Sequence, residues 1–256
     1  MELHHETTGA SGPWVVLIHA GICDSAMWEP QWRSLAGSHR LLRMDMRGFG
    51  RSPQPPEPYS NARDVLAVID ACGVERAALV GASLGGRVAL ELALAAPDRV
   101  SALVLAGSGL SGHEWSQDVR DYWAVEDAAI ERGDLDAAAE ANVRFWVAPA
   151  DAAVRAQVHA MQLRALELQV PVGDAAQEQL LVSDLDTRLA AIAAPALVVV
   201  GELDHPDIHA IAGRLVRELP DATHAIVPGA AHLPSLEQPA AFDALVAPFL
   251  AVSPRA

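Results

Sequence analysis

The chain has 256 residues, of which 51% are hydrophobic and 20% are charged, a composition that supports a large folded core and excludes a disordered chain. This length suits one large domain, or one core domain that carries an insertion. The formal net charge of -15 gives the surface a negative field, which disfavours nucleic acid and anionic lipid headgroups as partners. All 18 basic residues are arginine, so a lysine Schiff base is excluded.

The sequence contains few cysteines and no segment that resembles a signal peptide or a membrane span. The two cysteines, Cys23 and Cys72, are too few for a disulfide framework, and neither has the spacing of a metal ligand. No segment has the length and hydrophobicity of a membrane span, and the first residues do not follow the pattern of a signal peptide. We therefore expect a cytoplasmic protein that does not bind membranes.

Short aliphatic runs alternate along the chain with longer helical patterns, which predicts βα units and an α/β fold with a mostly parallel sheet between two layers of helices. Helices are expected over Ala62–Cys72 and Leu84–Ala96, and the second of these is apolar almost all round, so it should be buried. The predicted strands are Leu3–Thr7, Trp14–Ile18, Arg40–Met44, Ala77–Val80, Ala102–Leu105, Ala196–Val200 and His224–Val227.

Residues 111–185 interrupt this alternation with helical spacing and no clear strand. We interpret them as a helical cap, inserted after the sixth strand into a core made of residues 1–110 and 186–256. Each large apolar residue of the cap could simply pack it onto the core, but as a group they are candidates for the roof of a substrate pocket. These residues are Trp115, Tyr122, Trp123, Phe145, Trp146 and Met161.

The strongest chemical signal is the G-x-S-x-G motif Gly81-Ala-Ser83-Leu-Gly85, which lies between a predicted strand and a predicted helix. A turn this sharp forces its central residue into a strained backbone conformation, and side chains at 81 and 85 would collide with the facing elements. The hydroxyl of Ser83 would thus stand clear of the sheet at a helix N-terminus, where negative charge is favoured. The pattern predicts that Ser83 is a nucleophile.

A serine nucleophile needs a base, and the base needs an orienting group. Among ten histidines, His232 has the best position, in a loop after the last predicted strand. The segment 235–238, Ser-Leu-Glu-Gln, fits a capping box that would open the final helix and fix this loop. We expect His232 to be the base.

The acid should follow the strand Ala196–Val200, because strand ends at one edge of a parallel sheet lie close together. Three carboxylates crowd this loop: Glu202, Asp204 and Asp207. Asp204 is preferred because the Gly-x-x-Asp turn directs its side chain forward from the strand, and Asp207 is the alternative.

The chain order Ser83, Asp204, His232 resembles the α/β-hydrolase fold superfamily, in particular its capped serine esterases and lactonase-like enzymes. The resemblance runs from about Trp14 to Leu250, and it includes the segment His19-Ala-Gly21 and the turn Asp45-Met-Arg47-Gly48. It implies that the backbone amides of Gly21 and Leu84 form an oxyanion hole, beside which Ile22 faces the substrate. Ala20 departs from the glycine usual after the histidine, so Ile22 is an alternative to Gly21.

The resemblance implies a hydrolase that cleaves small or medium carboxylic esters or lactones through an acyl-enzyme, with Asp45, Arg47 and His19 as scaffolding. A carbon–carbon bond hydrolase, a hydroxynitrile lyase or a perhydrolase could use the same triad, and a ligand-binding protein could use the same fold. No nucleotide-binding loop is present, so no cofactor is expected. His205 and His209 lack further ligand spacing, so no metal is expected.

Overall fold

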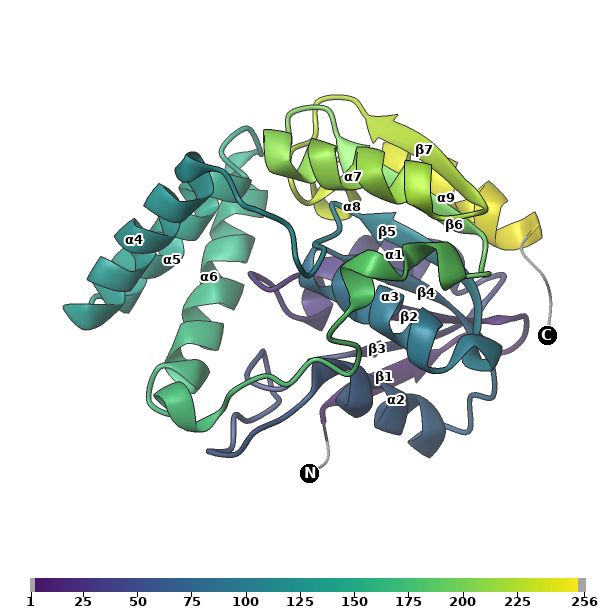
Figure 1. Ribbon diagram of the computed structural model, residues 1–256, viewed down its shortest axis with the longest axis horizontal. Coiled ribbons are helices and arrows are strands. Elements are labelled where there is room, and N and C mark those ends of the chain that lie inside the picture. Colours follow the sequence, from purple (N-terminus) through teal and green to yellow (C-terminus); the bar gives the residue numbers. More distant parts are fainter. Residues whose placement is uncertain (1–2, 253–256) are drawn as a thin grey trace.

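The computed structural model describes residues 3–252, which form one seven-stranded sheet with helices on both sides (Figure 1). The sheet order is β1-β3-β2-β4-β5-β6-β7. The strands are β1 (His5–Thr8), β2 (Trp14–Ile18), β3 (Arg40–Met44), β4 (Ala77–Ala82), β5 (Val100–Ala106), β6 (Ala196–Gly201) and β7 (Ala222–Val227). Only β1 is antiparallel to its neighbour, β3, and the remaining pairs are parallel, as the alternation of strands and helices predicts.

The described residues also form nine α-helices. They are α1 (Glu29–Leu35), α2 (Asn61–Ala71), α3 (Leu84–Ala95), α4 (Gln117–Glu131), α5 (Leu135–Trp146), α6 (Ala152–Gln169), α7 (Pro206–Glu218), α8 (Pro234–Glu237) and α9 (Pro239–Val252). The expected helix Leu84–Ala96 corresponds to α3, and most of its residues are buried.

The central strands bury both faces of the sheet. Alternate residues of β2 enter different apolar clusters: Val16 and Ile18 join one cluster, whereas Val15 and Leu17 join the other. The first cluster contains side chains of α2, α3 and α7, and the second contains side chains of α1, α8 and α9. The sheet therefore lies between two helical layers, which explains why its strands read as continuous apolar runs rather than alternating ones.

Helices α4, α5 and α6 lie together at one side of the molecule, away from the helices that cover the sheet (Figure 1). They share a small apolar cluster formed by Ala129, Ala138, Ala139 and Leu166. The insertion that contains them follows β5, the fifth strand of this chain, so the expectation that it follows the sixth strand is wrong. The reason is that β2 begins at Trp14 and leaves room for a single strand before it.

The segment that leads back from α6 to the core is attached to α3 by a charged network. The carboxylate of Glu91, which is buried, accepts hydrogen bonds from the backbone amides of Leu181 at 2.7 Å and Val182 at 3.3 Å. Arg87, one turn earlier in α3, pairs with Glu91 at 2.5 Å and with Glu178 at 2.7 Å. Partners on both sides make this buried carboxylate tolerable in the core.

The start of α3 packs unusually close to the end of β2. A Cβ atom on Gly85 would lie 2.2 Å from the carbonyl oxygen of Ile18, and one on Gly81 would lie 2.3 Å from the carbonyl oxygen of Gly85. These obstacles are backbone atoms, which cannot move aside as the end of a flexible side chain can. Glycine at both positions is therefore a requirement of the strand–turn–helix geometry.

We predict that Gly85→Ala lowers the free energy of unfolding by about 3 kcal/mol, because α3 must shift away from β2 to admit the methyl group. Gly213→Ala in α7 is the matched control, since a Cβ atom there would meet no atom within 4 Å beyond its own helical turns. The control should gain up to about 1 kcal/mol from the higher helix propensity of alanine. Chemical denaturation measures both values, and equal stability of the two variants would contradict the packing argument.

Candidate active site

Ser83 occupies the turn between β4 and α3 with φ 49° and ψ -111°, and it is the one non-glycine residue with positive φ between residues 3 and 252. Its backbone is held by four hydrogen bonds. The amide donates to Ala106 at 2.9 Å, and the carbonyl accepts from Gly86, Arg87 and Gly109. The side chain is half-buried, so its hydroxyl is accessible. A strained residue that its surroundings hold this firmly marks a functional position.

His232 follows β7, and its imidazole lies beside the Ser83 hydroxyl, with Nε2 2.9 Å from Oγ. The residue is only 2% exposed. Its backbone amide donates to the carbonyl oxygen of Trp146, and the indole of Trp146 packs on the imidazole with ring centroids 4.3 Å apart. The predicted base is therefore in contact with the predicted nucleophile, and a residue of α5 covers it.

Asp204 follows β6 and completes the chain of hydrogen bonds. Its two carboxylate oxygens lie 3.1 and 3.2 Å from Nδ1 of His232, and Oδ1 also accepts from the backbone amide of His205 at 2.7 Å. An ionised carboxylate can only accept hydrogen bonds, so Nδ1 must carry the proton. In this tautomer, the lone pair of Nε2 is directed at the serine hydroxyl. A general base requires this arrangement.

The other two acids of this loop have different partners. Asp207 accepts hydrogen bonds from the ring of His113 at 3.0 Å and the backbone amide of Ser116 at 3.2 Å. Burial acts to raise its pKa, but the hydrogen bonds from Ser116 and His113 outweigh that effect and lower it. Glu202 accepts from the backbone amide of Gly229 at 2.9 Å. Of the three acids, the structure brings Asp204 to His232, while Asp207 fixes the segment that leads into α4.

Glu237 in α8 stabilises the loop that carries His232. One carboxylate oxygen accepts from the backbone amide of Ala231 at 2.8 Å, and the other accepts from that of Leu233 at 2.8 Å. Burial raises the pKa of Glu237, although both hydrogen bonds oppose the shift. The predicted capping box is wrong, because Ser235 lies inside α8 rather than before it and its Oγ has no partner within residues 3–252. Glu237 therefore fixes the loop together with the bond from the amide of His232 to the carbonyl oxygen of Trp146.

Three backbone amides near Ser83 belong to residues of two adjoining segments, Gly21-Ile22 and the start of α3. Leu84 is the first residue of α3, and a Cβ atom on Gly21 would lie 3.6 Å from the Cβ of Leu84, so the two segments adjoin. Within the described part of the chain, the amides of Gly21, Ile22 and Leu84 donate no hydrogen bond. The structure therefore leaves both Gly21 and Ile22 as candidates for the predicted partner of Leu84.

His19 fixes the loop that contains Gly21. Its buried ring donates from Nδ1 to the carbonyl oxygen of Ala20 at 2.8 Å, and Nε2 accepts from the backbone amide of Met46 at 2.9 Å. Burial lowers the pKa of His19, which favours the neutral imidazole that makes these two hydrogen bonds. The ring thus links the loop after β2 to the loop after β3, as expected for a scaffolding residue.

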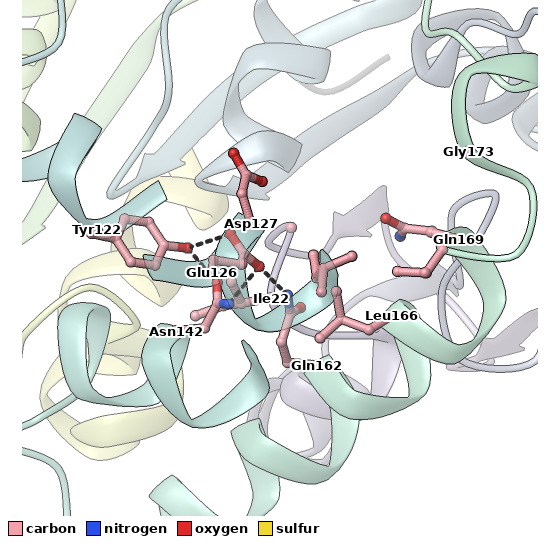
Figure 2. A pocket seen from close by; sticks show the side chains of 12 residues that line it. Ile22, Tyr122, Glu126, Asp127, Asn142, Gln162, Leu166, Gln169 and Gly173 are labelled. Atoms are coloured by element: carbon pink, nitrogen blue, oxygen red, sulfur yellow. Dashed lines mark hydrogen bonds between the residues drawn. The ribbon is translucent and has the colours of Figure 1, made fainter. Parts of the chain in front are cut away.

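A cavity of about 540 Å³ begins at Gly21 and Ile22 and extends between α4, α5 and α6 (Figure 2). Of the seven predicted pocket residues, Ile22 and Tyr122 line it. The others lie elsewhere. Trp146 covers His232, Phe145 stacks between Tyr122 and His205, Trp115 contacts Trp123, and Met161 is buried in the second core cluster.

The polar residues that line this cavity were not predicted from the sequence. They are Glu126, Asp127, Asn142, Gln162 and Gln169. Tyr122 and Glu126 are four residues apart in α4, so their shared helix face was available as a signal.

The structure also bears on the binding of a metal or a membrane. His205 caps α7 by accepting from the amide of Asp207, and its side chain is 15% exposed. No group of three or more His, Cys, Asp or Glu side chains suited to a metal ion occurs within residues 3–252. Over the same residues, every helix is too short or too polar to cross a bilayer.

Comparisons with known proteins show which family this chain belongs to. A protein from Variovorax paradoxus assigned as a carbamate hydrolase (RutD) is 34% identical, over 98% of this chain and 97% of its own length. A pimeloyl-[acyl-carrier protein] methyl ester esterase from Pectobacterium atrosepticum is 30% identical, over 96% and 98% respectively. The crystal structure of an enol-lactonase from Burkholderia xenovorans superposes with a TM-score of 0.80 at 26% identity, over 97% and 96%. A family model for the alpha/beta hydrolase fold matches residues 13–239, so the chain belongs to the alpha/beta hydrolase family.

Proposed function

We propose that this protein is a serine hydrolase that cleaves small or medium carboxylic esters or lactones without a cofactor. The observation that supports the proposal most strongly is the unbroken chain of hydrogen bonds from Asp204 through His232 to the hydroxyl of Ser83. The names of the relatives support the same class of chemistry, because they describe cleavage of a carbamate, a methyl ester and an enol-lactone. A cytoplasmic location belongs to the same proposal.

In the first half of the reaction, Nε2 of His232 accepts the proton of Ser83 as Oγ attacks the carbonyl carbon of the substrate. The carbonyl oxygen becomes an oxyanion, which accepts hydrogen bonds from the amide of Leu84 and from that of Gly21 or Ile22. Each such donor contributes about 3 kcal/mol to the transition state. The bond to the leaving oxygen then breaks, His232 returns its proton to that oxygen, and the acyl group remains on Ser83.

In the second half, a water molecule gives a proton to Nε2 and attacks the acyl-enzyme. The tetrahedral intermediate collapses with release of the carboxylic acid, and the proton on His232 passes to Oγ of Ser83. A lactone follows the same steps, except that the leaving hydroxyl stays attached to the acyl group. Asp204 stabilises the imidazolium that forms twice in each cycle.

The first prediction concerns the nucleophile. A fluorophosphonate probe should label the native protein at one site, because an activated serine displaces fluoride from phosphorus. Ser83→Ala should abolish both labelling and turnover of simple esters while it leaves the free energy of unfolding within about 1 kcal/mol of the native value. Mass spectrometry of the labelled protein makes the measurement. An unlabelled, correctly folded native protein would instead favour a binding function.

The second prediction separates the two candidate acids. Asp204→Asn should reduce kcat by about 10⁴-fold, because the asparagine amide would donate to Nδ1 and turn the wrong tautomer of His232 toward Ser83. Its oxygen can still accept from the amide of His205, so the fold should be retained.

Asp207→Asn is the matched control, since it also removes the charge of a buried carboxylate, three residues further along in the first turn of α7. We expect it to retain kcat within about tenfold of the native value, because its carboxylate contacts His113 and Ser116 rather than His232. Steady-state kinetics on an activated ester compares the two variants. An inactive Asp207→Asn beside an active Asp204→Asn would reverse the assignment of the acid.

A further inference from the structure

The cavity between the cap helices contains a buried polar cluster that the triad does not use. At its centre, the carboxylate of Glu126 accepts hydrogen bonds from Nδ2 of Asn142 at 2.6 Å and Nε2 of Gln162 at 3.4 Å, and it lies 3.3 Å from the Tyr122 hydroxyl, whose single proton it shares with a nearer acceptor. That nearer acceptor is the amide oxygen of Asn142. Figure 2 shows these side chains converging from α4, α5 and α6, with Leu166 and Gln169 beside them.

One atom of this cluster has no partner within the described residues: Oε1 of Gln162. Gln162 is one of the residues that line the cavity and is only 6% exposed, and its Oε1 is a buried acceptor without a partner in the described part of the chain. Its amide cannot simply be reversed, because Oε1 would then face the carboxylate oxygen of Glu126, which is itself an acceptor. A buried acceptor without a partner is costly, and a ligand with a donor group would remove that cost.

The charge of the cavity indicates which ligand groups it favours. Two acidic residues, Glu126 and Asp127, line it, and none of its twelve lining residues is basic. Burial raises the pKa of Glu126, while the hydrogen bonds from Asn142 and Tyr122 act in the opposite direction. A ligand carboxylate would meet the negative charge of Glu126 and Asp127 with no basic side chain to pair with it, whereas a hydroxyl, an amide N–H or an ammonium group would find carboxylate and amide acceptors.

One end of the cavity lies beside the turn that carries Ser83. Gly21 and Ile22 line this end, and Gly21 adjoins Leu84, the residue that follows Ser83. Apolar side chains of Ile130, Leu166 and Val170 lie along the remaining wall. A substrate whose carbonyl lies at Ser83 could therefore pass a hydrocarbon segment along this wall toward Gln162 and Glu126.

We propose that the Glu126–Gln162 cluster is a specificity subsite for a hydrogen-bond donor that the substrate carries away from its scissile carbonyl. The preferred substrates are thus esters or lactones with a distal hydroxyl, amide N–H or ammonium group, and those with a distal carboxylate are disfavoured. This proposal rests on the proposed function, since it assigns the substrate class of the same site. Gln162 and Glu126 act in specificity, and they take no part in bond cleavage.

The test uses matched series of esters that differ only in the distal substituent: methyl, hydroxyl, ammonium or carboxylate. One series carries the substituent on the acyl chain and the other carries it on the alcohol, each over a range of chain lengths. For the native protein, kcat/KM for the best hydroxyl or ammonium ester should exceed that of its methyl and carboxylate counterparts by about tenfold or more.

Two variants of the cluster sharpen the test. Gln162→Met keeps the size of the side chain but removes the acceptor, so the preference for the hydroxyl ester over the methyl ester should fall to about twofold or less. Glu126→Gln should reduce the preference for ammonium over methyl in the same way. Glu131→Gln, which removes an exposed acid from the same helix, is the control and should leave every ratio unchanged.

Binding provides a readout that does not depend on turnover. In the Ser83→Ala background, calorimetry with the same esters should give the same order of Kd values, and Gln162→Met should abolish the difference in Kd between the hydroxyl and methyl esters.

Equal affinities and equal kcat/KM across the native series would overturn the subsite and leave the proposed hydrolase function intact. Selective binding by a native protein that cleaves none of the esters would support the subsite and contradict the proposed function. If the cluster only joins the cap helices, Gln162→Met would alter stability but no ratio, which also overturns the proposal.

Discussion

The turn between β4 and α3 determines where every other part of the site must lie. Ser83 adopts a backbone conformation that costs of the order of 1–3 kcal/mol for a residue with a side chain, and the four hydrogen bonds to its backbone offset that cost. Two of them come from α3, and the other two come from β5 and the loop that follows it. The serine is thus held by the best-buried part of the sheet, and its hydroxyl is presented without any need for a conformational change.

The parallel sheet brings the remaining groups to this turn. Asp204 follows β6 and His232 follows β7, and the ends of both strands lie at the same edge as the end of β4. The cap contributes to this arrangement as well. The carbonyl oxygen of Trp146 accepts the amide hydrogen of His232, and its indole covers the imidazole, so α5 shields the base from solvent. Hydrogen bonding within this sheltered site is stronger than it would be in water.

The sequence predicted the parts of the molecule that depend on local pattern. The run Trp14–Ile18 coincides with β2, a central strand that is apolar along its whole length, and Arg40–Met44 coincides with β3, in which Leu41, Leu42 and Met44 are buried. The choice of Asp204 over Asp207 agrees with the geometry, because the turn after β6 leaves it beside His232. The insertion of α4 to α6 was also visible, as a long stretch of helical spacing.

What the sequence did not predict depends on tertiary contacts. Glu237, rather than a serine cap, fixes the loop of His232, and the choice between them rests on where Pro234 begins α8. The aromatic residues of the cap suggested an apolar roof, yet the cavity is lined by a cluster around Glu126 whose members come from three helices. Helical periodicity shows which face of one helix is apolar. It does not show which polar side chains of different helices will meet.

We propose that Ser83 forms a covalent acyl intermediate, which can be trapped and identified. An activated carbamoyl ester is suitable, because carbamoyl-enzymes hydrolyse slowly enough to accumulate. Intact-mass measurement after an acid quench, followed by peptide mapping, should show one carbamoyl group per chain, attached to Ser83 and absent after His232→Ala. Stoichiometric carbamoylation of a different residue, together with loss of ester hydrolysis, would contradict this account of the site.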